Sequence, residues 1–156
     1  QKDDNEIINM MSKIWLPNDE NFMDYQEIEA FIVSLMKDYK VKEVAYDPAF
    51  FERSAQVLLD RGVPMVNFPQ THSRMIPACG NAYDLIANTK VRHNGDPTFT
   101  DQVMSAAQRT TDMGWRLSKG RSKRKIDAAI AMVIMLDRIT APDPLDDEPK
   151  VAIINL

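Results

Sequence analysis

Two aspartates in separate parts of the sequence have the surroundings of candidate metal ligands. Asp47 follows the short predicted strand KEVAY, and Asp127 lies in the largely apolar segment KIDAAIAMVIML. An acid at the carboxyl end of a strand faces the crevice in which open α/β proteins bind their ligands. Carboxylate oxygens are the ligands that Mg²⁺ and Mn²⁺ prefer. If the two carboxylates meet, they predict a divalent-metal site, the type of site that hydrolyses phosphodiesters.

Each aspartate also has a structural explanation. Asp before Pro often begins a helix, with the carboxylate as N-cap, and on local sequence alone this role is favoured for Asp47 over a metal role. Asp127 lies in a predicted helix that is apolar on nearly every side, where an unpartnered carboxylate would be costly. It should therefore be paired, capped or bound to a metal, or else lie open to solvent at the helix start, where the helix dipole favours an acid.

The segment that leads to Asp127 is strongly basic, since between residues 109 and 125 Asp112 is its only acid. Such a run would bring a phosphate backbone toward the carboxylates, and the alternative is a solvated loop. No feature indicates that base edges are read, so we expect binding to be largely indifferent to sequence. Trp115 would either stack on DNA or pack inside the protein. The candidate DNA contacts are Arg116, Lys119, Arg121, Lys123, Arg124 and Lys125.

Other residues favour structural roles or exclude whole classes of function. His72 and His93 lack the spacing of metal ligands, and the single cysteine, Cys79, is expected to be a small buried residue. No GxxxxGK[ST] phosphate loop is present. The net charge of −4 argues against a uniformly basic nucleic-acid binder. No apolar run approaches the roughly 20 residues of a membrane span, and we expect no membrane association.

The elements that must position these residues alternate between strands and helices. We expect strands at 6–15, 42–46 and 64–68, an extended piece at 91–93 and a strand or hairpin around Gly114 at 109–117. We expect helices at 25–38, 48–61, 76–89, 98–107 and 123–140. Residues 151–156 could dock as a final strand. This alternation predicts an α/β architecture in which helices flank a mixed sheet.

Five segments, taken in order, resemble the C-terminal nuclease domain of phage terminase large subunits, a domain with the RNase H-like fold. They cover most of residues 6–138, and the YDP and KIDAA pieces are the most telling. The segments are EIINMMSKIWLP, VKEVAYDPAFF, GVPMVNFPQTHSRMIPA, KVRHNGDPTFTDQVMSAA and RSKRKIDAAIAMVIML.

The resemblance implies an endonuclease that holds two Mg²⁺ or Mn²⁺ ions with three acidic positions and cuts concatemeric viral DNA during headful packaging. Asp47 corresponds to the second acid and Asp127 to the third. The family's first acid lies on a strand that precedes EIINMMSKIWLP, whereas this sequence opens in the turn after that strand. Asp3 and Asp4 fall in the wrong place to replace it. We therefore expect an N-terminally truncated RNase H-like sheet that lacks this acid.

The resemblance also implies partners and a cellular location. The implied partners are double-stranded DNA, the terminase ATPase domain, the small terminase subunit and the portal, in the cytoplasm of the infected bacterial host. We expect residues 1–141 to form the nuclease domain and residues 142–156 an acidic, proline-containing C-terminal tail. Two alternatives stay open: a non-catalytic DNA-binding or packaging-assembly remnant of a terminase, and another RNase H-like nuclease such as a junction resolvase.

Overall fold

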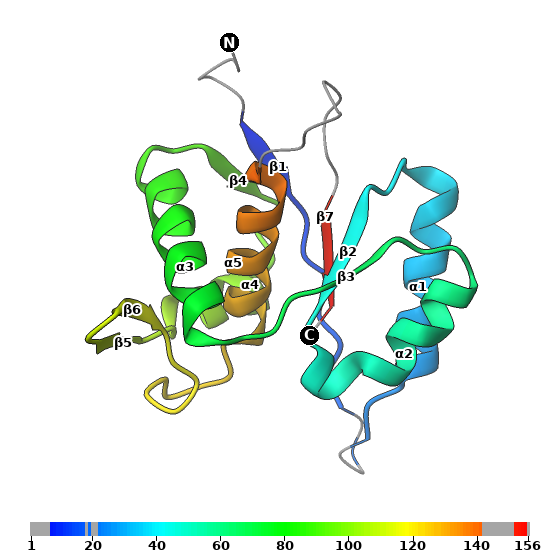
Figure 1. Ribbon diagram of the computed structural model, residues 1–156, viewed down its shortest axis with the longest axis horizontal. Coiled ribbons are helices and arrows are strands. Elements are labelled where there is room, and N and C mark those ends of the chain that lie inside the picture. The colour runs from blue at the N-terminus through cyan, green and yellow to red at the C-terminus, as the bar shows by residue number, and fades with distance from the viewer. Residues whose placement is uncertain (1–6, 18, 20–21, 142–151, 156) are drawn as a thin grey trace.

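The computed structural model describes residues 7–17, 19 and 22–141, and the backbone of residues 152–155. Strands and helices alternate along these residues (Figure 1), which confirms the predicted α/β class. The elements are β1 (Ile8–Met10), α1 (Tyr25–Asp38), β2 (Glu43–Tyr46), α2 (Pro48–Asp60), β3 (Met65–Asn67), α3 (His72–Ala87), β4 (Val91–His93), α4 (Pro97–Met104), β5 (Gln108–Thr111), β6 (Gly114–Leu117), α5 (Asp127–Thr140) and β7 (Ala152–Asn155).

The described strands form three small sheets that include both parallel and antiparallel pairs. The first has the order β3-β2-β7 with all pairs parallel, and the second pairs β1 with β4, also in parallel. The third is the antiparallel β5–β6 hairpin. The expected final strand is present as β7, whose residue Ala152 aligns with Glu43 of β2. The mixed strand directions agree with the prediction, although the strands are divided among separate sheets.

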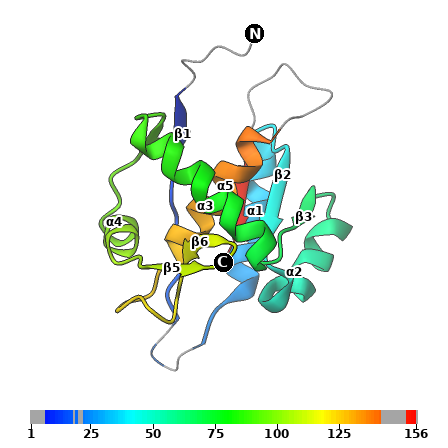
Figure 2. The same cartoon turned by 60° about the vertical axis from the view of Figure 1, so that its left-hand side comes forward.

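Strand β2 is the centre of the architecture because both of its faces are covered by helices. Val44 and Tyr46 belong to the apolar cluster formed with α1 and α2. Ala45, which points the other way along the strand, belongs to the cluster formed with α3 and α5. Figure 1 shows the two pairs of helices on opposite sides of β2, and Figure 2 shows α3 in front of α5. The sheet is therefore the middle layer between two helical layers.

Helix α5 is buried on nearly all sides, as its composition predicted. Its buried residues are Ala128, Ala129, Ile130, Met132, Val133, Ile134, Met135 and Leu136. Near its C-terminus, Arg138 donates from Nε to Glu43 Oε1 at 2.7 Å and from Nη2 to Glu43 Oε2 at 2.8 Å. This bidentate ion pair fixes the C-terminal part of α5 against the start of β2. Asp127 lies at the other end of the helix, its N-terminus.

Three elements have a boundary that differs from the sequence prediction by four residues or more. The strand expected at 6–15 is limited to β1, because its partner β4 offers only three residues to pair with and Met11 beyond it is 74% exposed. Helix α3 begins at His72 rather than residue 76, so Pro77 lies inside the helix. Helix α5 begins at Asp127 rather than residue 123: residues 123–126 are not helical, and Gln102 of α4 accepts the N–H of Ala128 in the first turn of the helix.

The β5–β6 hairpin packs closely on α3. Gly114 has a φ of +129°, and a Cβ at this position would lie 2.8 Å from Cγ2 of Ile76. Only glycine accommodates both the backbone angle and the close approach. The Trp115 ring packs edge-on to Tyr83, with 6.2 Å between ring centroids, and contacts the core beside α3. Of the two roles expected for Trp115, the structure shows internal packing.

Candidate metal and nucleic-acid site

Asp47 lies at the junction of β2 and α2, where it caps the helix. Its Oδ1 accepts the backbone N–H of Ala49 at 3.1 Å, and Pro48 occupies the first helical turn. The structural role that the Asp-Pro pair predicted is therefore present. Within the described part of the chain, no other hydrogen bond or ion pair reaches this carboxylate, so its second oxygen is available to a ligand.

Asp127 is the first residue of α5 and remains partly open to solvent. The residue before it, Ile126, cannot cap a helix with its side chain. Instead the buried Gln102 of α4 accepts the N–H of Ala128 through Oε1 at 2.8 Å, which fixes where α5 begins. The Asp127 carboxylate, 37% exposed, forms an ion pair with Lys119 Nζ. The expectation that this acid is partnered or solvated at the helix start is therefore confirmed.

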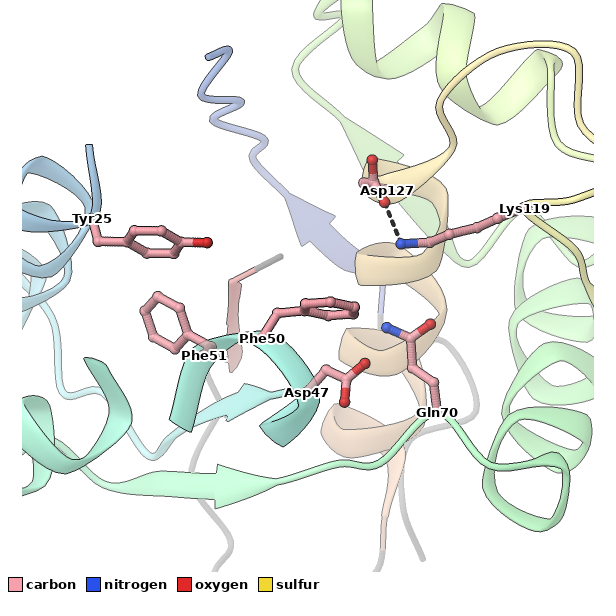
Figure 3. A pocket seen from close by; sticks show the side chains of 7 residues that line it. All are labelled: Tyr25, Asp47, Phe50, Phe51, Gln70, Lys119 and Asp127. Atoms are coloured by element: carbon pink, nitrogen blue, oxygen red, sulfur yellow. Dashed lines mark ion pairs between the residues drawn. The ribbon is translucent and has the colours of Figure 1, made fainter. Parts of the chain in front are cut away.

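Both aspartates line the same open pocket (Figure 3). Asp47 reaches it from the carboxyl end of β2 and Asp127 from the N-terminus of α5. The aromatic side is formed by α1 and α2, where Phe50 is 79% exposed. The complete lining is Tyr25, Asp47, Phe50, Phe51, Gln70, Lys119 and Asp127. The fold thus brings two acids that are distant in sequence to one place.

The chemistry of the donors fits one hard divalent cation. Mg²⁺ binds through one or two carboxylates and keeps several waters, and carbonyl oxygens also suit it as ligands. The pocket supplies two carboxylates and the amide of Gln70. Within the residues that the structure describes, no group of three or more His, Cys, Asp or Glu side chains is arranged to hold a metal. The two ions that the family resemblance implies therefore stay a prediction.

Gln70 is a pocket residue that the sequence analysis missed. It follows β3, and Phe68 N–H donates to Tyr46 O at 2.8 Å, so the carboxyl ends of β3 and β2 lie together. Residues that follow β3 therefore reach the same edge of the sheet as Asp47, which follows β2. Figure 3 shows the Gln70 side chain pointing into the pocket. Its backbone carbonyl accepts Arg116 Nη1 at 3.0 Å, which links the pocket to the β5–β6 hairpin.

The predicted DNA-contacting residues divide into two groups. Arg116, Lys119 and Arg124 have partners within the protein: the Gln70 carbonyl, the Asp127 carboxylate and, at 2.6 Å, Asp101 Oδ1. By contrast, three exposed residues form no ion pair with any described residue. These three are Arg121, Lys123 and Lys125. They form the exposed basic group, whose side chains are available to a phosphate backbone.

The cysteine and the histidines have the structural roles that were expected. Cys79 is 1% exposed, and burial raises the pKa of its thiol, so the nucleophilic thiolate is disfavoured. His93 Nδ1 accepts the N–H of Gly95 at 3.1 Å, and its ring lies against Phe99. His72 is exposed at the start of α3. Neither histidine lines the pocket.

The sequence matches, over residues 1–143, the family described as "Terminase large subunit, endonuclease domain". The terminase large subunit of Enterobacteria phage HK97 is 28% identical over 116 residues, which are 72% of this chain and 23% of the relative. The chain thus spans about a quarter of that relative's length.

Solved structures of large terminases share the fold. The crystal structure of the HK97 bacteriophage large terminase has a TM-score of 0.67 and 25% identity, covering 74% of this chain and 25% of that one. The large terminase nuclease from thermophilic phage G20c with bound magnesium has a TM-score of 0.60 and 17% identity, covering 74% of this chain and 62% of that one. These similarities confirm the predicted RNase H-like fold.

Proposed function

This chain belongs to the family of terminase large-subunit endonuclease domains, and we propose that it is a divalent-metal-dependent endonuclease domain that cuts concatemeric viral DNA during genome packaging. The observation that carries the proposal is the shared pocket of Asp47 and Asp127. The magnesium bound to the G20c terminase nuclease supports the choice of cation, and Mn²⁺ has the same preference for oxygen ligands.

In this proposal Asp47 and Asp127 bind the cation, and contacts within the protein fix the positions of both residues. The helix cap orients the Asp47 carboxylate, and the Gln102 contact fixes the start of α5 and hence Asp127. When bound, the metal would activate a water and stabilise the leaving oxygen of the phosphodiester. The N-termini of α2 and α5 both begin at the pocket and favour the approach of an anionic phosphate. Two ions, as in the family resemblance, remain a prediction.

The basic residues before α5 are proposed to hold the DNA backbone. Arg121, Lys123 and Lys125 are the exposed members, while Arg116 and Arg124 would need to leave an internal partner to bind phosphate. The same proposal includes the remaining partners and the location: the terminase ATPase domain, the small subunit and the portal, in the cytoplasm of the infected host. The structure contains, among its described helices, none long and apolar enough to cross a membrane.

The proposed domain division keeps residues 1–141 as the nuclease domain and residues 142–156 as the C-terminal tail. The family match over residues 1–143 is compatible with this division. Residues 142–151 and 156 lie outside the described part of the chain. The backbone of β7, which is within the tail, pairs with β2 of the domain.

Plasmid nicking tests the proposed activity. Supercoiled plasmid is incubated with the 156-residue chain and Mg²⁺ or Mn²⁺, beside Asp47→Asn and Asp127→Asn. Asparagine also caps helices, so Asp47→Asn removes the charge and keeps the helix start. We expect each variant to lose nicking by at least about 100-fold, since even outer partners of metal ligands change activity by 10–100-fold.

Asp96→Asn is the matched control. Asp96 also precedes a proline and caps a helix, α4, by accepting Phe99 N–H at 2.7 Å, but it does not line the pocket. Its variant should nick plasmid as the unmodified protein does. Equal losses in all three variants would show that removing any carboxylate at a helix start impairs nicking, and that the losses at Asp47 and Asp127 do not report metal binding.

A second candidate function is a non-catalytic DNA-binding or packaging-assembly module. The structural roles that both acids already have, Asp47 as a helix cap and Asp127 in an ion pair with Lys119, favour it. Salt-sensitive DNA binding without nicking, unchanged in Asp47→Asn and Asp127→Asn, would support this module. Family membership leaves the junction-resolvase alternative without support.

A further inference from the structure

We propose that Lys119 is a built-in competitor of the metal: its ammonium neutralises Asp127 in the metal-free protein, and a divalent cation binds by displacing it. This inference rests on the proposed metal site of Asp47 and Asp127. Lys119 Nζ forms an ion pair with Asp127 Oδ1, and Lys119 lines the pocket together with both aspartates (Figure 3). A positive charge therefore already lies where the carboxylates would attract a cation.

The turn that carries Lys119 is held by hydrogen bonds on both sides of the residue. Ser118 O accepts the N–H groups of Arg121 and Ser122, each at 3.2 Å, and the Ser122 hydroxyl at 2.8 Å. The turn is also attached to the residue that precedes β5. Ser118 N–H donates to Ala107 O at 2.9 Å, and Ala107 N–H donates to Ser122 Oγ at 3.0 Å. The backbone of Lys119 is thus fixed within reach of Asp127.

The exposure of the pair makes the displacement feasible. The Lys119 side chain is 52% exposed and that of Asp127 is 37% exposed. Ion pairs this open to solvent contribute little, so a divalent cation that contacts both carboxylates can replace the single ammonium. Lysine has a flexible aliphatic side chain that ends in a compact charge. The released ammonium can therefore remain at the rim of the pocket, where a DNA phosphate would lie.

Manganese binding measures the competition without any need for nuclease activity. Isothermal titration with Mn²⁺ compares the 156-residue protein with Lys119→Met, which keeps an unbranched side chain and removes the charge. We expect Lys119→Met to bind Mn²⁺ about three- to tenfold more tightly, because one competing positive charge is gone from the pocket. Lys119→Arg retains a competitor and should bind Mn²⁺ as the unmodified protein does.

Lys123→Met is the matched control for general charge effects. It removes the same charge from the same turn region, where Lys123 is exposed and forms no ion pair with a described residue. Its Mn²⁺ affinity should change by less than about twofold, since exposed charges at a distance are screened by salt. An equal tightening in Lys123→Met, or no tightening in Lys119→Met, would overturn the role of Lys119.

Asp47→Asn and Asp127→Asn separate failure of this inference from failure of the metal site. If Mn²⁺ binding is lost in both while Lys119→Met binds no more tightly, the metal site stands and the competition is rejected. If Mn²⁺ binding is unaffected by either substitution, or absent from all proteins, the metal site and the competition are rejected together. Thermal denaturation of each variant establishes that the protein is folded.

Discussion

One oxygen of Asp47 accepts the N–H of Ala49 while the carboxylate also faces the pocket that it shares with Asp127. Capping the helix and binding a ligand are compatible roles for Asp47, because a carboxylate already held by a helix cap loses less conformational freedom when it binds a ligand. Asp127 is held differently, by an ion pair with Lys119. At the scale of single residues, the candidate site is therefore two oriented acids and one lysine that contacts one of them.

Asp137 of α5 gives a prediction for stability against pH. Burial raises the pKa of this carboxyl, and Glu43 adds to the effect, against the opposing attraction of Arg74 and Arg138. A raised pKa means that the folded state binds the proton more tightly than the unfolded state does. The charged form therefore costs stability above the folded pKa, and this cost disappears as the pH falls below the unfolded value of about 3.9.

The neutral variant Asp137→Asn should remove that cost. We expect its melting temperature to exceed that of the unmodified protein at pH 7, with the difference shrinking toward pH 3.5 as Asp137 becomes protonated. Circular dichroism melting curves at the two pH values measure the effect. Asp84→Asn, an exposed position on α3, is the control and should not change the melting temperature. A lower melting temperature for Asp137→Asn at pH 7 would mean that attraction to the arginines outweighs burial.

Among the elements, those whose ends depend on local sequence were predicted well. Both ends of α1 agree, and its start is fixed locally because Asp24 caps the helix by accepting the N–H groups of Gln26 and Glu27. The predicted start of α5 was wrong because the observed start depends on Gln102, a residue of α4 that is distant in sequence. The predicted length of β1 was wrong because the strand extends only as far as its pairing with β4. Local patterns predict caps and periodicity, whereas contacts between elements decide the remaining boundaries.

The basic turn before α5 gives a prediction for DNA binding. The triple variant Arg121→Gln, Lys123→Gln and Lys125→Gln removes the exposed basic group. Each phosphate contact contributes about 0.9 to the slope of log affinity against log salt, so the slope should fall by about 2 to 3. Fluorescence anisotropy of a labelled duplex, measured over a series of salt concentrations, gives this slope.

Arg124→Gln is the control within the same segment. Arg124 is already paired with Asp101, so its loss should leave the slope nearly unchanged, well short of the drop of about 0.9 expected for one phosphate contact. If Arg124→Gln lowers the slope as much per residue as the triple variant does, the division into paired and exposed basic residues is incorrect.

Across the whole molecule, the topology brings together residues that no local pattern connects. The parallel pairing of β2 and β3 places Asp47 and Gln70 at one edge, and the packing of α5 beside β2 adds Asp127. The sequence predicted the two acids because each had unusual neighbours. It did not predict Gln70, Tyr25 or Phe50, whose place in the pocket depends on how the loops and helices meet.

The central claim is that Asp47 and Asp127 bind one divalent cation between them. Crystals of the 156-residue protein soaked in Mn²⁺ and measured at the manganese absorption edge test it directly. We predict an anomalous peak in the pocket at about 2.1 Å from an oxygen of each aspartate, close to the distance at which Mg²⁺ binds carboxylate oxygens. A peak bound to only one of them, or no peak in the pocket with Lys119 still on Asp127 at saturating Mn²⁺, would contradict the account.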